Sequence, residues 1–348
     1  MRTSSCCGAF LKPHAHRRKR CRACGKTFTI RPRTRGRKLK RQRLSLAHAI
    51  LRNGTSLRGL SETRGINRET LRRRFYGSAA AWLRAHPLPE VPDQGPLIAM
   101  ADALWFQTRN HKPKYGCFGI LIRPVNETTG YVTVLTLRRG RESKVAWQQV
   151  IKLLPRSVRK RIVALIADGF TGLSSIAAEE GWHFQWCHIH VRRRLAELRG
   201  LRKVPGREIR RQAQRLIHTF LETEDEARAN ECQRRLRCLF ALPECPPTLP
   251  TRLSGVIHRS HLLRTYRHAS DLNLPVSTNS IERVNAFIRE RVRLARGLNS
   301  EKSLRHWLRI LQHQHPKIQC RGFKETIDKN HRKSVSLSRP SDRIVIAQ

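Results

Sequence analysis

The order of apolar and polar segments from residue 97 onward predicts an α/β fold. Residues 97–105 form an almost continuous apolar run, as expected for a strand covered on both faces. Residues 115–122 and 131–137 are rich in β-branched and aromatic side chains and predict two further strands. The next segments alternate between helix and strand patterns, at 143–154, 161–167, 173–180 and 183–187. The order βββαβαβ predicts a mixed sheet with helices between its later strands.

Helical spacing dominates the remainder of the chain. The segment after residue 188 is mostly helical and strongly basic, although prolines interrupt it at 243–250. A last helical block covers 279–312, and polar residues prevail after Lys317. We therefore expect three parts: a core from 97–188 and 275–315, an all-helical insertion over 189–274, and a polar tail over 318–348.

A helical unit precedes this core, separated from it by the proline-rich stretch 87–92. Residues 44–86 contain three short helical patterns, at 44–52, 56–63 and 67–75, with Asn67 as a predicted N-cap. This layout is typical of a helix-turn-helix, although any small three-helix bundle fits it too. Four residues of the last helix would then face the DNA major groove or its phosphates: Arg68, Thr70, Arg72 and Arg73.

The strongly positive charge of the chain predicts a polyanionic binding partner. The chain has 71 Lys and Arg against 25 Asp and Glu, a formal charge of +46, and its first acidic residue is Glu62. A basic arm that excludes acids is typical of a nucleic-acid contact surface, whereas a solvated charged surface is the plainer interpretation. Basic side chains in the helical insertion predict contacts with the DNA backbone: Arg192, Arg193, Arg194, Arg202, Arg207, Arg210 and Arg211.

The same composition argues against a membrane or secreted protein. The longest apolar runs, 97–106 and 162–167, are much shorter than the roughly 20 residues of a spanning helix. Residues 1–8 lack the apolar centre of a secretory signal. The ten cysteines have no framework spacing, which suits a reducing compartment. We expect a cytoplasmic, nucleoid-associated protein.

Cysteines near the amino terminus predict a zinc-ribbon-like knuckle over residues 1–30. Cys21 and Cys24 form a C-x2-C turn, and Gly25 permits the tight backbone that directs two thiolates at one tetrahedral ion. Cys7 is the predicted third ligand, and the fourth is Cys6 or His16. Cysteines that bind no metal in a basic loop are the alternative.

Two aspartates lie among apolar residues where an ionised carboxylate is costly. Asp102 lies within the first apolar strand, and Asp168 directly follows the fourth. Such a group costs several kcal/mol unless it is paired or bound to a cation, and a buried ion pair with Arg explains either acid alone. Two acids on neighbouring strands repel each other, and a divalent cation relieves that repulsion.

Glu282 is the candidate third carboxylate. It begins a helix whose buried face would contain Ile281, Val284 and Ile288. A helix-capping role is the alternative, because an N-cap at Asn279 with Glu three residues later fits a capping box. Glu290 is the next candidate on the same helix.

Three features together resemble Mutator-type (MULE-like) insertion-sequence transposases of bacteria and archaea: the strand order, Asp-Gly at 168–169, and Thr-Asn-Ser-Ile-Glu-Arg-Val-Asn at 278–285. The resemblance covers about residues 97–312. It implies a ribonuclease-H-like core with a DDE triad of Asp102, Asp168 and Glu282, and a zinc knuckle and helix-turn-helix as attachments. It implies two Mg²⁺ or Mn²⁺ ions, a homo-oligomer on DNA, cleavage at element ends and strand transfer into target DNA.

Further positions match the family's motifs. Arg283, which we expect to contact DNA, and Asn285 flank the Glu, and Cys187 and His190 occupy a C-x2-H motif. The last two either share a metal or pack structurally, and His188 is an equally interesting imidazole. One departure is Ala103, where relatives often carry Gly. A non-catalytic DNA-binding regulator and a ribonuclease-H-like nuclease are the alternative functions.

Overall fold

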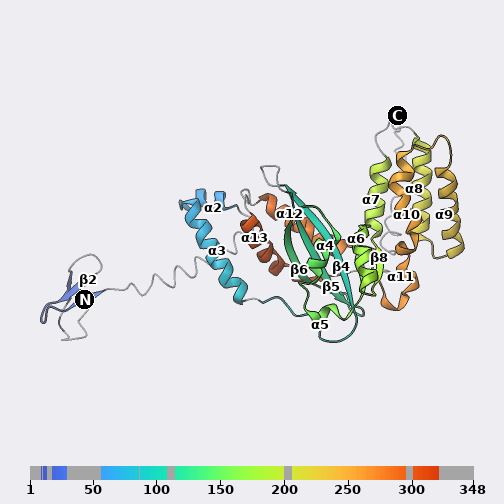
Figure 1. Ribbon diagram of the computed structural model, residues 1–348. Helices are drawn as coiled ribbons and strands as arrows, with labels where there is room; N and C mark the ends of the chain where they lie inside the picture. Colours follow the sequence, from blue (N-terminus) through green and yellow to red (C-terminus); the bar gives the residue numbers. More distant parts are fainter. Residues whose placement is uncertain are drawn as a thin grey trace, which may run out of the picture. The chain divides into compact units, whose positions relative to one another are not determined.

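The computed structural model (Figure 1) describes most of the chain: residue 9 and residues 11–13, 18–29, 56–85, 87–107, 114–199, 206–294 and 301–320. The chain divides into two compact units, residues 1–85 and 86–348, which are described separately.

The first unit contains a small antiparallel sheet and two helices. The sheet joins β1 (Leu11–Pro13), β2 (Arg18–Cys21) and β3 (Thr27–Thr29), and the helices are α2 (Leu57–Arg64) and α3 (Arg68–Ala85). Asn67 Oδ1 accepts a hydrogen bond from the Glu69 backbone N–H at 2.9 Å, which confirms the predicted N-cap. Helix α3 extends well beyond the predicted 67–75, and the predicted helix 44–52 lies outside the described residues.

The turn between α2 and α3 follows from two local features. Gly65 ends α2 with φ 59°, a left-handed conformation that costs glycine little. Ser61 Oγ donates to the Ile66 carbonyl at 2.7 Å and holds the turn. Leu71 and Phe75 of α3 are buried, as is Leu60 of α2, so the two helices pack through one apolar stripe.

The second unit is built on a six-stranded mixed sheet with the order β8-β7-β4-β5-β6-β9. Strands β4, β5, β6 and β9 pair antiparallel with their neighbours, whereas β7 pairs parallel with β4 and β8 pairs parallel with β7. The strands are β4 (Leu97–Gln107), β5 (Lys114–Pro124), β6 (Thr129–Arg139), β7 (Ile162–Ala167), β8 (His183–Trp186) and β9 (Lys317–Gln319). A mixed α/β architecture is thereby confirmed.

Helices cover both faces of this sheet. On one face, Trp147 of α4 packs edge-on against Phe118 of β5, with ring centroids 4.8 Å apart. On the other face, Ile281 of α12 lies over Gly119. The helices of the core are α4 (Lys144–Ile151), α5 (Arg156–Arg159), α6 (Thr171–Glu179), α12 (Asn279–Leu294) and α13 (Glu301–Gln314).

A helical block separates β8 from α12, and Figure 1 shows its longer helices gathered in one bundle. Its helices are α7 (His188–Arg199), α8 (Arg207–Glu222), α9 (Glu226–Phe240), α10 (Thr248–His258) and α11 (Thr265–His268), with two 3-10 turns, η1 (Ser260–Leu263) and η2 (Ser270–Leu272). None of the helices in the described ranges is long and apolar enough to cross a membrane.

Buried polar side chains attach this block to the sheet. Gln185 of β8 donates to the Leu263 carbonyl at 3.1 Å and accepts from the Tyr266 backbone N–H at 2.9 Å. Arg264 is only 3% exposed and donates to the Phe220 carbonyl near the end of α8 at 2.9 Å. Because buried polar groups are costly when unpaired, these bonds fix the block in one position.

The predicted strands and helices of the core agree with the structure, apart from two elements. Strand β9 lies inside the segment expected to be a polar tail from residue 318, and it pairs with β6 through Ile318 opposite Gly130. The rest of that tail lies outside the described residues. The short helix α5 was not predicted, because its four residues carry two arginines and only one apolar side chain.

A pair of glycine substitutions tests the packing. At Gly169 an added Cβ would lie 2.2 Å from the buried Trp186 ring, so Gly169→Ala should lower the free energy of unfolding by about 1–3 kcal/mol. At Gly77, within α3, an added Cβ meets open space, so Gly77→Ala should raise that free energy by about 0.5–1 kcal/mol. Urea unfolding measures both, and equal effects at the two sites would contradict the packing described.

Candidate functional site

Asp102 lies within β4, and Asp168 directly follows β7, the parallel neighbour of β4. The register between the two strands ends at Met100 and Ile166, each two residues before one of the aspartates, and the charge of Asp168 acts on the Asp102 carboxylate. Strand β7 ends at Ala167, whereas β4 continues to Gln107. Asp102 therefore lies within its strand, and only Asp168 lies directly past a strand end. The Phe170 backbone N–H donates to Asp168 Oδ1 at 3.1 Å and fixes that carboxylate.

Helix α12 brings Glu282 to the same face of the sheet. Gly119 of β5, which pairs with Asp102, has no side chain, and Ile281 occupies the space above it. Four residues beyond Ile281, Asn285 donates from Nδ2 to Asp102 Oδ2 at 2.8 Å. The predicted buried face of this helix is confirmed, because Ile281, Val284 and Ile288 are all buried.

The capping interpretation of Glu282 does not agree with its contacts. Asn279 is the first residue of α12 instead of its N-cap. Glu282 Oε1 instead lies 3.1 Å from the Thr278 hydroxyl, and Oε2 accepts a hydrogen bond from Arg193 of α7. Glu290, the alternative candidate, is exposed and about 12 Å further along the helix.

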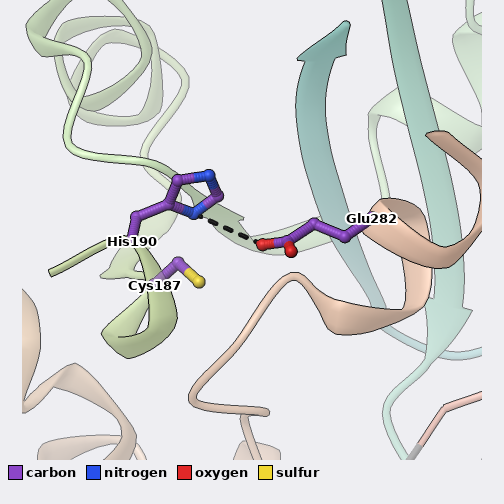
Figure 2. Close-up of side chains that lie close together, drawn as sticks. All are labelled: Cys187, His190 and Glu282. Carbon is purple, nitrogen blue, oxygen red and sulfur yellow. Dashed lines mark ion pairs between the residues drawn. The ribbon is translucent and has the colours of Figure 1, made fainter. Parts of the chain in front are cut away.

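His190, near the start of α7, lies between the carboxylates of Asp102 and Glu282. Its Nε2 is 4.0 Å from Asp102 Oδ1, and its Nδ1 is 3.6 Å from Glu282 Oε1 (Figure 2). Cys187 lies beside His190 and is fully buried, and its Sγ accepts from the Thr278 backbone N–H at 3.3 Å. One ligand atom each from Cys187, His190 and Glu282 lie within 4.8 Å of one another.

His188, the other candidate imidazole, has a structural role. It is buried, its Nε2 lies 2.7 Å from the Leu263 carbonyl, and its ring packs edge-on against Tyr266. Burial lowers the pKa of His188 to about 4, so this imidazole is neutral at physiological pH. It holds the start of α7 against η1 and α11.

Electrostatics of the site reflect the crowding of its acids. Burial, together with the nearby Glu282 and Asp168 carboxylates, raises the pKa of Asp102, although the hydrogen bond from Asn285 opposes that shift. Burial alone would lower the pKa of His190, but contacts with Cys187, Asp102 and Glu282 raise it to about 9. A cationic imidazole therefore partly neutralises the carboxylates when no metal is bound.

Glu142, a fourth acid near this site, was missed by sequence reasoning. It lies in the turn between β6 and α4, and its Oε1 accepts from Trp147 Nε1 at 2.6 Å. Burial, together with the charges of Asp168 and Asp102, raises the pKa of Glu142, although the Trp147 hydrogen bond opposes this. In the sequence it follows Arg139-Gly-Arg, so it has the pattern of an ordinary charged turn.

Several arginines of the helical block contact other side chains of the protein itself. Arg192 pairs with Glu222 at 2.8 Å, Arg193 pairs with Glu282, and Arg194 lies 5.7 Å from the centroid of the Trp186 ring. Arg211 lies 3.7 Å from Glu208. The prediction that these side chains contact the DNA backbone did not include these structural roles. Arg202 lies outside the described residues.

The predicted DNA-reading helix presents arginines to solvent. Arg68, Arg72 and Arg73 of α3 are exposed, and Thr70 is half-buried. Arg73 follows the buried Leu71 by two residues, about 200° around the helix, so it lies opposite the packed stripe. Arg72 is paired with Glu69 at 2.9 Å. DNA contact by these residues, and by the exposed Arg283 of α12, stays a prediction.

The predicted zinc knuckle is described in part. Cys21 ends β2 and Cys24 lies in the turn toward β3, where Gly25 has φ 72° and donates its N–H to the Cys21 carbonyl at 3.1 Å. A glycine in this left-handed conformation closes the turn, as the sequence indicated. The other proposed ligands, Cys6, Cys7 and His16, lie outside the described residues, so zinc binding stays a prediction.

A mixed sheet on which distant acids converge beside a basic helical block is an arrangement suited to enzymes that act on nucleic acids. A family model described as "Transposase, Mutator family" matches residues 100–319, which span β4 to β9 and all three acids. The chain therefore belongs to the Mutator family of transposases. Comparison with curated protein sequences finds no significant match.

Removing the charge of Asp102 should stabilise the metal-free protein. Asp102→Asn keeps the shape and can still accept from Asn285, but it removes a buried negative charge that is near two others. We expect a higher unfolding temperature at neutral pH. Because the folded-state pKa of Asp102 is raised, the gain should shrink as the pH falls and the wild-type carboxyl becomes protonated. A lower unfolding temperature at neutral pH would contradict this electrostatic account.

Proposed function

We propose that this protein is a DNA transposase that cleaves DNA strands at the ends of a mobile element and transfers them into target DNA. The observation that supports the proposal is the approach of two other acids to Asp102: the charges of Glu282 and Asp168 both act on its carboxylate, and Asn285 and His190 connect it to α12 and Glu282. Three antiparallel strands followed by two parallel ones support a ribonuclease-H-like core, in which acids of this kind hold the catalytic ions.

The donor set fits divalent cations such as Mg²⁺ or Mn²⁺. All three side chains offer carboxylate oxygens, which hard cations prefer. The buried Nδ1 of His190 has no hydrogen-bond partner in the described structure and lies 3.6 Å from Glu282 Oε1, beside the acids. Two bound ions would activate the attacking oxygen and stabilise the leaving 3′ oxygen of the scissile phosphate.

The protein's own residues prepare this site. Asn285 orients Asp102, the Phe170 backbone orients Asp168, and Thr278 with Arg193 orient Glu282. Residues that orient metal ligands in this way are often worth a factor of about 10 to 100 in activity or metal affinity. Because Arg193 donates to Glu282 through a side chain that is 57% exposed, it can also reach a DNA phosphate at the rim of the site.

We further propose that the first unit recognises DNA through a zinc-ribbon-like knuckle and a helix-turn-helix. Gly65 and Asn67 give α2 and α3 the tight turn of that motif, and the exposed Arg73 supports a DNA-facing side of α3. Transposition joins paired ends, so we expect a homo-oligomer assembled on DNA in the nucleoid of the cytoplasm.

Cleavage should depend on each of the three acids. With Mg²⁺ or Mn²⁺, the purified protein should nick DNA that carries the element ends and join them to target DNA. Asp102→Asn, Asp168→Asn and Glu282→Gln should each remove this activity, whereas Asn285→Ala should lower it about 10- to 100-fold. Gel assays of nicked and joined products provide the measurement.

The controls separate the alternatives. Glu290→Gln, which changes an exposed acid of the same helix, should retain full activity. Normal nicking by Glu282→Gln would exclude Glu282 as the third ligand and leave Glu142 as the next acid to replace. Cleavage without joining would indicate a nuclease, and DNA binding without cleavage would indicate a regulator.

Salt dependence tests DNA contact by α3. Each phosphate contact contributes about 0.9 to the slope of log affinity against log salt concentration. Arg73→Ala should therefore weaken DNA binding and reduce the slope by about that amount. Arg58→Ala is the matched control, because Arg58 is also exposed, on α2, but pairs with Glu62 at 3.0 Å. Fluorescence anisotropy at several salt concentrations measures both, and an unchanged slope for Arg73→Ala would remove this residue from the interface.

A further inference from the structure

We propose that Cys187, His190 and Glu282 form a separate binding site for a thiolate-preferring divalent transition metal of the Zn²⁺ class, and that this site shares Glu282 with the proposed catalytic centre. An ion bound there would compete with Mg²⁺ for one carboxylate and so inhibit the enzyme. The metal site rests on geometry alone, whereas the inhibition rests also on the proposed function.

The spacing of the donor atoms suits a shared ion. One donor atom each from Cys187, His190 and Glu282 lie within 4.8 Å of one another, and His190 Nδ1 is 3.6 Å from Glu282 Oε1. That separation is too long for a hydrogen bond, yet it is close to the distance between two ligands of a tetrahedral ion with bonds of about 2.0–2.2 Å. Figure 2 shows the imidazole and the carboxylate facing each other across this gap, with Cys187 beside His190.

The unsatisfied ring nitrogen is the second observation that points to a ligand. His190 Nδ1 is buried and has no hydrogen-bond partner in the described structure, although it faces the carboxylate of Glu282. A buried polar atom without a partner is costly in a folded protein unless another ligand satisfies it. Three ligands from the protein leave a fourth tetrahedral position open to water, as in many zinc sites.

The chemistry of the donors selects the class of ion. A thiolate, an imidazole and one carboxylate together favour Zn²⁺ over Mg²⁺, which prefers oxygen ligands. Zinc-binding imidazoles commonly direct their second ring nitrogen toward a carboxylate, and His190 Nε2 faces Asp102 Oδ1 at 4.0 Å. The Thr278 backbone N–H, which donates to Cys187 Sγ at 3.3 Å, would further stabilise a thiolate.

Competition between the two kinds of ion follows from Glu282 itself. Its Oε2 is held by Arg193, and its Oε1 faces His190. A transition-metal ion bound to Oε1 would therefore occupy the one Glu282 oxygen that is left to bind a Mg²⁺ ion together with Asp102 and Asp168. Micromolar Zn²⁺ should then lower Mg²⁺-dependent cleavage, and a chelator that removes Zn²⁺ but spares Mg²⁺ should restore it.

Cobalt absorption tests the site without relying on activity. Co²⁺ bound to a thiolate has a charge-transfer absorption in the near ultraviolet, and the ion substitutes for Zn²⁺. We would titrate Co²⁺ into the full chain with Cys6, Cys7, Cys21 and Cys24 replaced by Ser, so that the predicted knuckle is silent. One equivalent of Co²⁺ should produce the thiolate band, and Zn²⁺ should displace it, as the higher affinity of Zn²⁺ requires.

Variants in the same background assign the band. Cys187→Ser should abolish it, and His190→Gln should weaken Co²⁺ binding more than 10-fold while circular dichroism shows a folded chain. Cys238→Ser is the control, because Cys238 is an exposed thiol of α9 outside the cluster, and it should leave the band unchanged.

Each result has a definite consequence. An absent band at saturating Co²⁺, or a band unaffected in both the Cys187 and the His190 variants, would overturn the metal site. A band without DNA cleavage under any condition would keep the metal site and reject the proposed transposase activity. A band with cleavage that Zn²⁺ does not inhibit would keep both sites and reject their competition.

Discussion

Mutual repulsion between carboxylates is the constraint around which this core is arranged. Asp168 follows the strand next to the one that contains Asp102, and the charges of Asp168 and of Glu282 from α12 both act on the Asp102 carboxylate. In a metal-free protein these charges oppose folding, and the neighbours that offset them are few and specific. His190 lies between two of the acids, Asn285 donates to one, and Arg193 donates to another. The large positive charge of the chain does not replace these contacts, because exposed charges are screened by salt over a distance of about 10 Å.

The approach of α12 to the sheet depends on the absence of a side chain. Gly119 pairs with Asp102 and leaves the space that Ile281 occupies, so Glu282 and Asn285 reach the acids of the sheet. A second dependence is on the helical block that precedes α12. Gln185 of β8 fastens that block to the sheet, Arg264 holds the block together through the Phe220 carbonyl of α8, and the His188 backbone N–H donates to the Val276 carbonyl at 2.9 Å. These contacts hold the segment before α12 in place, and they thereby help to position Glu282 in the first turn of that helix.

Much of this core could be predicted from sequence, because its strands bury both faces and are therefore nearly continuous apolar runs. Asp102 and Asp168 were recognisable for the same reason, since a charged residue in such a run needs a physical explanation. Strand β9 was not recognisable: it has three residues, and its pairing with β6 depends on contacts across the fold. Glu142 was missed because its raised pKa comes from burial and partly from the nearby Asp168, and the local sequence does not indicate that the two residues are close. The sequence also could not distinguish His188 from His190, because the direction in which each side chain leaves the first turn of α7 decides which imidazole lies beside the carboxylates.

The position of Glu282 along the chain has a consequence for how the protein is made. The two aspartates emerge from the ribosome with the sheet, but the third acid follows only after the whole helical block has been synthesised. Closing a loop of that length costs entropy, which the packing of Ile281 and its neighbours must repay before the three acids meet. A nascent or truncated chain that stops within the helical block would therefore carry both aspartates and the amino-terminal unit, yet could not assemble the complete set of acids. Synthesis of the carboxyl-terminal helices thus sets the earliest moment at which the proposed catalytic centre can be complete.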